Sequence, residues 1–81
     1  MKVIYFAWIK EITKIEEEMI INNEIQNLDN FKKYLIKKYP NLKKHIQDGI
    51  LRFAVNQDYI VDDIELFNDD EIAVFPPVSG G

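Results

Sequence analysis

The segment NLDNFKKYLIKKYPNL, at positions 27–42, is the one stretch with the clear periodicity of an amphipathic helix. Its apolar residues recur at spacings of three or four: Leu28, Phe31, Leu35 and Tyr39. This spacing places them on one helix face and predicts an apolar stripe that packs against other elements. Asn27 or Asp29 can cap the start of the helix. Pro40 ends it, because the residue before a proline avoids the helical region.

Segments rich in β-branched and aromatic residues flank this helix and predict strands. Two such segments precede the helix and three follow it: 3–8, 17–21, 50–56, 59–61 and 71–75. Residues 11–15 form a short connector with room for one helical turn, and Glu16–Glu18 are expected to reach solvent. Asp48-Gly49 and residues 56–58 have the composition of turns, and the connection over residues 62–71 is polar.

The order strand, strand, helix, then three strands is that of the β-grasp fold, an α+β arrangement in which one main helix covers a mixed sheet. We therefore expect a ubiquitin-like domain over residues 1–75 and an extended C-terminal tail over residues 76–81. In this fold the first and last strands are neighbours at the centre of the sheet. The apolar runs VIYFAW and IAVF suit that position.

The side chains that the sequence lacks narrow its chemistry. The 81 residues include no cysteine and one histidine, His45, so we expect no thiol nucleophile and no transition-metal site. A catalytic triad cannot be assembled from one histidine without a serine motif, and there is no glycine-rich phosphate loop. We therefore do not expect a self-contained enzyme, and we expect this chain to bind no cofactor or metal.

Charge is distributed unevenly along the chain. Residues 1–45 carry nine lysines against six acidic residues, whereas residues 46–81 carry only Arg52 against eight. The acidic half argues against nucleic acid as a partner, since phosphates would be repelled. The excess of acidic residues in the second half is explained either by a basic partner or by a solvated surface. No stretch approaches the roughly 20 apolar residues of a membrane span. Since no disulfide is possible either, we expect a cytoplasmic protein without a membrane partner.

The sequence ends in FPPVSGG, at positions 75–81. Pro76 and Pro77 stop the strand after Phe75, because they donate no hydrogen bond to a sheet and hold φ near about −65°. The six residues after Phe75 reach at most about 20 Å, at roughly 3.3 Å per residue. Such a tail can leave a folded domain and enter a partner. The candidate partner-binding residues are Phe75, Pro76, Pro77, Val78, Ser79 and Gly80.

The last residue supplies the one reactive group of this tail. Val78 is a small apolar anchor and Ser79 is compact, while Gly80 and Gly81 let the backbone approach a narrow tunnel closely. The α-carboxylate of Gly81 is ionised at neutral pH and is a poor electrophile. Adenylation with ATP would give this carboxylate a leaving group, and a sulfur donor could then convert it into a thiocarboxylate.

Three segments resemble the small subunit of molybdopterin synthase, a ubiquitin-like sulfur carrier, over nearly the whole chain. They are MKVIYFAWIKE at the start, DGILRFAVNQ at 48–57 and NDDEIAVFPPVSGG at the end. The ending resembles the family pattern D-G-D-E-[VI]-A-x-[FIL]-P-P-V-[ST]-G-G and is the most specific of the three. Asp69 stands where glycine is commoner in the family, and Trp8 where a smaller or polar residue is usual.

The resemblance implies a mechanism for the tail. A ubiquitin-activating-like adenylyltransferase would adenylate the Gly81 carboxylate with ATP, and a sulfur donor protein would convert it into a thiocarboxylate. Residues 75–81 would insert into the large synthase subunit, which is expected to hold the active site. Sulfur would then pass to cyclic pyranopterin monophosphate (precursor Z), regenerating the carboxylate. In the family the working assembly is a heterotetramer of two small and two large subunits.

The resemblance also implies a hydrophobic docking surface at the end of the sheet. Phe75 is the first candidate for that surface. Phe6 and Phe53 are candidates for either the surface or the core, and the core is favoured for both. For these two residues, neither periodicity nor composition distinguishes a core position from a surface position.

Three alternatives remain open at this point. A thiamine-pathway sulfur carrier has the same fold and the same terminal chemistry, although such chains are usually shorter and lack FPPVSGG. A ubiquitin-like protein modifier needs the same adenylation and differs only in the fate of Gly81. A β-grasp interaction module needs no reactive terminus, so deleting Gly80 and Gly81 would leave its function intact.

Overall fold

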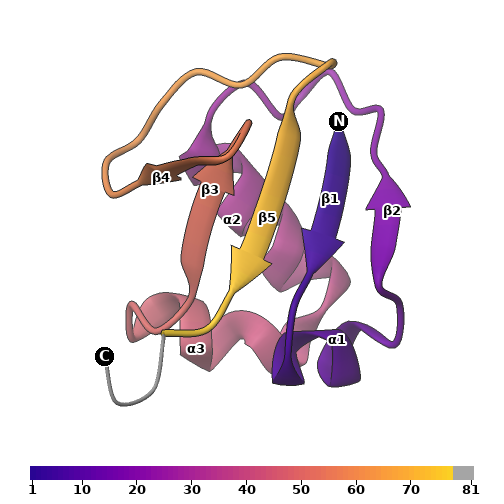
Figure 1. Cartoon of the computed structure of the whole chain (residues 1–81), viewed down its shortest axis with the longest axis vertical. Helices are drawn as coiled ribbons and strands as arrows, with labels where there is room; N and C mark the ends of the chain where they lie inside the picture. Colours follow the sequence, from indigo (N-terminus) through magenta and orange to yellow (C-terminus); the bar gives the residue numbers. More distant parts are fainter. Residues whose placement is uncertain (78–81) are drawn as a thin grey trace.

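The computed structural model describes residues 1–77, which form a five-stranded mixed sheet with the long helix α2 across one face (Figure 1). In chain order the elements are β1 Lys2–Tyr5, α1 Trp8–Thr13, β2 Glu17–Met19, α2 Leu28–Lys38, the 3₁₀ turn η1 Pro40–Leu42, α3 Lys43–Gln47, β3 Arg52–Val55, β4 Asp58–Ile60 and β5 Glu71–Phe75.

The strand order is β2-β1-β5-β3-β4. The first and last strands, β1 and β5, are parallel neighbours, and the other three pairs are antiparallel. This arrangement confirms the predicted α+β, β-grasp fold. Strand β5 is the central strand in this order, and it pairs with β1 on one side and β3 on the other, so it holds the two hairpin units of the sheet together.

Helix α2 begins where the sequence indicates. The Asn27 side chain caps it by accepting a hydrogen bond from the Asn30 backbone N–H at 2.8 Å, so Asn27 rather than Asp29 is the cap. The helix ends at Lys38, and Tyr39 follows as the C-terminal cap just before Pro40. The predicted apolar stripe forms the helix side of the core, since Leu28, Phe31 and Leu35 are buried.

The core lies between α2 and the face of the sheet that this helix covers. Alternate residues of the central strands face it, including Val3 and Tyr5 of β1 and Ile72 and Val74 of β5. The Phe31 and Phe53 rings meet edge to face, with centroids 6.2 Å apart. By the same alternation, Ala73 and Phe75 point to the face of the sheet that α2 leaves uncovered, which faces the viewer in Figure 1.

The predicted first strand is too long. Strand β1 ends at Tyr5 instead of Trp8, and α1 begins at Trp8, earlier than the helical turn expected over residues 11–15. The chain bends at Ala7, whose φ of 55° is rare for a residue with a Cβ atom. No local residue marks this bend, because the apolar run continues through it. The sequence also gave no periodic signal for the five-residue helix α3.

The β3–β4 hairpin turns through two residues, Asn56 and Gln57, with φ values of 51° and 73°. Positive φ at both central positions is the geometry of tight hairpins. The Asn56 side chain also reaches the neighbouring segment: it donates to Asp70 Oδ1 at 2.9 Å and accepts from the Glu71 N–H at 3.0 Å. These bonds fix the start of β5 against the turn.

Candidate functional site at the end of the central strands

The parallel strands β1 and β5 end side by side. Tyr5 lies opposite Val74 in the register, and the Phe6 N–H donates to the Val74 carbonyl at 3.0 Å. The short helices α1 and α3 lie at this same end of the sheet (Figure 1). The chain that leaves β5 through Pro76 and Pro77 therefore starts beside Phe6.

Three aromatic residues lie near this point, and we call them the exit surface. They are Phe75 at the end of β5, Tyr59, whose ring contacts it, and Phe6, whose backbone bonds to β5 at Val74. Phe6 is 46% exposed and Tyr59 57% exposed, whereas Phe75 is half-buried. The Tyr59 and Phe75 rings are in contact, with centroids 6.3 Å apart. Exposed aromatic rings beside a chain exit are the kind of residue that anchors protein partners.

The exit surface confirms one sequence expectation and corrects another. Phe53 is only 4% exposed and belongs to the core, as favoured. The core expectation for Phe6 is wrong. Tyr5 faces the core, so the next residue, Phe6, points to the uncovered side and its ring lies at the surface. Tyr59 was not singled out by the sequence. The hairpin register, which pairs Tyr59 with Ala54 on the uncovered face, is the signal that could have found it.

The two prolines end the sheet as expected. The last paired residue of β5 is Phe75, which lies opposite Arg52 of β3. Pro76 is half-buried and Pro77 is exposed. The other candidate residues of the tail, Val78, Ser79, Gly80 and Gly81, lie outside the described residues, so their roles stay predictions.

His45 lies on α3, where its ring packs against Trp8 of α1 with centroids 4.7 Å apart and the ring planes tilted by 57°. This contact joins the two short helices at the exit end of the sheet. Trp8 is 38% exposed, so part of its ring adds apolar area at this end of the molecule. Within residues 1–77 no group of three or more metal-binding side chains occurs.

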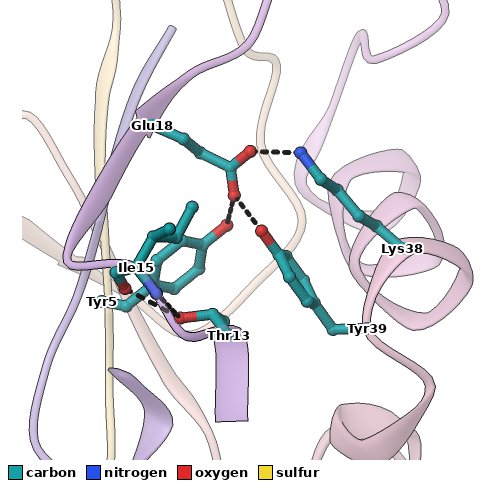
Figure 2. Close-up of polar contacts among 6 residues, drawn as sticks. All are labelled: Tyr5, Thr13, Ile15, Glu18, Lys38 and Tyr39. Carbon is teal, nitrogen blue, oxygen red and sulfur yellow. Dashed lines mark hydrogen bonds and ion pairs between the residues drawn. The ribbon is translucent and has the colours of Figure 1, made fainter. Parts of the chain in front are cut away.

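A polar cluster, separate from the exit surface, lies between β2 and the end of α2 (Figure 2). One Glu18 carboxylate oxygen accepts hydrogen bonds from the Tyr5 and Tyr39 hydroxyls, each at 2.6 Å. The other oxygen bonds the Lys38 ammonium group. The expectation that Glu18 reaches solvent is wrong, since its side chain is only 10% exposed. Glu16 and Glu17 are exposed as expected.

The contacts in this cluster shift the pKa values of its members. Burial works to raise the pKa of Glu18, but the hydrogen bonds from Lys38, Tyr39 and Tyr5 outweigh it and lower the pKa. Burial and then the bond to Glu18 raise the pKa of Tyr5, and the same two causes raise the pKa of Tyr39 to about 12. The cluster therefore holds one carboxylate ionised and two phenols neutral, which ties β2 to the helix.

The fold and the exit surface together define the class: a ubiquitin-like β-grasp protein whose central strand leads into a Pro-Pro-Val-Ser-Gly-Gly sequence. The chain matches the ThiS family over residues 3–81 and belongs to that family. No helix within the described part of the chain has the length and apolar character to cross a membrane.

Relatives and solved structures agree with this assignment. The molybdopterin synthase sulfur carrier subunit of Dictyostelium discoideum is 36% identical, over 99% of this chain and 94% of its own. A putative molybdopterin converting factor subunit 1 from Pyrococcus furiosus has a similar structure, with a TM-score of 0.82, 30% identity and 95% of each chain covered.

A further solved structure is a complex of subunits 1 and 2 of the molybdopterin-converting factor from Helicobacter pylori. One of its chains matches this one with a TM-score of 0.66 and 25% identity, over 99% of this chain and 96% of that one. The resemblance to the sulfur carrier subunit of molybdopterin synthase, first seen in three sequence segments, is therefore confirmed.

Proposed function

We propose that this protein carries sulfur in molybdenum cofactor biosynthesis, with the C-terminal Gly81 as the carrier group. Family membership and the names of the relatives support the pathway. The observation that carries the proposal is the path of β5, which ends in Pro76-Pro77 beside the exit surface and continues in sequence to Gly80-Gly81. The proposal divides the chain into a docking domain, residues 1–75, and a working tail, residues 76–81.

The chemistry of the tail follows from its carboxylate. An adenylyltransferase joins the Gly81 carboxylate to the α-phosphate of ATP and releases pyrophosphate. A donor protein then delivers sulfur at the oxidation level of hydrosulfide, which displaces AMP and leaves a thiocarboxylate. The thiocarboxylate sulfur attacks the cyclic pyranopterin monophosphate, and water cleaves the resulting thioester to restore the carboxylate. A dithiolene needs two sulfur atoms, so two charged tails are consumed for each product.

This chain supplies the tail and the docking surface, while the large subunit of molybdopterin synthase supplies the catalytic groups. The solved Helicobacter pylori complex of subunits 1 and 2 supports such a partner for a chain of this fold. The exit surface is suited to hold the large subunit because it presents two exposed aromatic rings, Phe6 and Tyr59, near the strand end from which the tail leaves. ATP binds to the adenylyltransferase and not to this chain, and the process takes place in the cytoplasm.

Two changes at the terminus test the carrier role. Appending one alanine after Gly81 should abolish adenylation, because the carboxylate would then sit one residue too far along. Gly81→Ala should leave the unfolding midpoint unchanged and reduce sulfur transfer sharply, because a Cβ intrudes where backbone must pass a narrow channel. The assay is transfer of sulfur from charged protein to precursor in the presence of the large subunit. Normal transfer by the extended protein would refute the terminal mechanism.

The docking role has its own test with a matched control. Phe6→Ala and Tyr59→Ala should each weaken large-subunit binding by roughly tenfold, the loss typical of an aromatic anchor. Phe67→Ala is the control, because Phe67 is 55% exposed but lies before the opposite end of β5. Equal losses for all three variants in a binding titration would show that the exit surface is not the docking site.

A further inference from the structure

Helix α2 and the segment before it form a groove that the sulfur-carrier proposal does not use. The groove has a volume of about 450 Å³, and the segment 22–25 and α2 form its two walls. It lies along α2, which covers the opposite face of the sheet from Tyr59 and Phe75, so it stays accessible when the exit surface is occupied.

The groove is basic along the α2 wall, and both walls contribute one apolar side chain. Three lysines of α2 line it, against the single carboxylate of Glu24: Lys33, Lys37 and Lys38. Ile25 and the Tyr34 ring supply the apolar contacts. This basic wall contrasts with the acidic second half of the chain, so an acidic ligand would be attracted here and repelled elsewhere.

The groove is held open by bonds that do not depend on a ligand. The Asn22 side chain accepts from the Glu24 N–H at 2.9 Å, and the Asn30 side chain accepts from the Gln26 N–H at 3.2 Å. The first bond holds a turn within the segment, and the second fixes the end of the segment to the first turn of α2. Lys38 is anchored by Glu18 and lies 5.7 Å from the centre of the Tyr34 ring.

The three lysines differ in whether their charge is already paired with a carboxylate. Lys38 is paired with Glu18, and Lys33 is paired with Asp29 at 3.1 Å, although that pair is exposed and therefore weak. Among the ion pairs of residues 1–77, Lys37 takes part in none. Lys33 and Lys37 thus offer positive charge to a ligand while Lys38 stabilises the groove.

We propose that this groove binds an acidic, extended peptide segment of a partner protein. Lys33 and Lys37 are one helical turn apart, a rise of about 6 Å. Alternate side chains of an extended strand are about 6.6 Å apart, so two carboxylates at alternate positions can meet both lysines. The intervening apolar side chains would point to the opposite wall, at Ile25. A phosphate group fits less well, because the positive groups are spread in a row and no glycine-rich loop lines the groove.

The test uses a fluorescein-labelled peptide of alternating glutamate and leucine, titrated with the full-length protein and followed by fluorescence polarisation. The double variant Lys33→Glu/Lys37→Glu should weaken binding by about tenfold or more, the effect of replacing two attractions with two repulsions. The control Lys43→Glu/Lys44→Glu makes the same charge change at exposed positions of α3. It should weaken binding by less than about threefold, because long-range attraction is screened by salt.

Further measurements check the folding of the variants and distinguish a peptide in the groove from a phosphate compound or a second copy of the chain. Circular dichroism checks that both double variants are folded, and Lys37→Gln, a milder change, should still weaken binding by roughly threefold. Peptide-induced NMR shifts should include Ile25 and Tyr34. The proposal is overturned if both double variants lose affinity equally, or if the shifts gather at the exit surface. It is also overturned if tripolyphosphate binds the groove more tightly than the peptide. The same holds if sedimentation shows a dimer of the native chain that the Lys33→Glu/Lys37→Glu variant does not form.

Discussion

Replacing Glu18 with glutamine removes the charge on which three donors converge. Glutamine keeps an acceptor for the Tyr5 and Tyr39 hydroxyls but presents its amide group to the Lys38 ammonium. A hydrogen bond to a charged group contributes roughly 1 kcal/mol more than a neutral one, so the two phenol bonds lose about 2 kcal/mol together. The Lys38 pair is 42% exposed on the lysine side, and its loss adds only about 0.5 kcal/mol.

The free energy of unfolding should therefore fall by roughly 2–3 kcal/mol, which corresponds to a drop in melting temperature of about 10–20 °C for a domain of this size. Urea unfolding, followed by circular dichroism and by the fluorescence of the single tryptophan, measures the change as a shift in midpoint. Glu16→Gln is the matched control, because Glu16 is exposed and makes the same change of charge nearby. The control should stay within about 0.5 kcal/mol of the native protein.

The pH dependence provides an independent arm of this test. Because the folded pKa of Glu18 lies below its ordinary value, its contribution is present above the ordinary carboxyl pKa of about 4.3 and is lost as pH falls through the folded pKa. The stability difference between native protein and Glu18→Gln should shrink in that window. A loss below about 0.5 kcal/mol at neutral pH, or a difference that stays constant down to pH 3, would refute the reasoning.

Three other predictions concern the hairpin and the phenols. Gln57→Gly should raise the free energy of unfolding by about 0.5–1 kcal/mol in urea titrations, because glycine adopts the positive φ of this turn without a Cβ clash. Asn56→Ala should lower it by roughly 2–3 kcal/mol, since two hydrogen bonds to the start of β5 are lost and the positive φ remains. Stability should also fall above the ordinary tyrosine pKa of about 10, because Tyr5 and Tyr39 keep their protons only in the folded state; a flat profile from pH 8 to 11 would contradict this.

The sequence predicted the features that are determined by neighbouring residues or by the order of the elements. Helix α2 was recognisable because its apolar spacing, its Asn27 cap and Pro40 all point to the same boundaries. The pairing of β1 with β5 followed from the order of the elements and from two apolar runs. The end of the tail-bearing strand was also predictable, because Pro76 and Pro77 act through their own covalent geometry.

Features that depend on contacts across the fold were not predictable. Glu18 looks like any exposed strand glutamate until Tyr5, Lys38 and Tyr39 are brought to it from other elements. The early end of β1 and the start of α1 depend on the backbone bend at Ala7, which no glycine or proline marks. For the tail the sequence is the source of the prediction. Its chemistry is inferred from the residue types, and Val78, Ser79, Gly80 and Gly81 lie outside the described residues.

The most direct test of the sulfur-carrier proposal is mass spectrometry of the C-terminal peptide from protein isolated from its own cells. Replacing oxygen with sulfur changes the mass almost as much as oxidising Met1 or Met19 to the sulfoxide, so the change must be localised to the last peptide. The proposal predicts a thiocarboxylate on Gly81. An unmodified Gly81, even after incubation with ATP, an adenylyltransferase and a sulfur donor, would contradict it and favour a β-grasp interaction module.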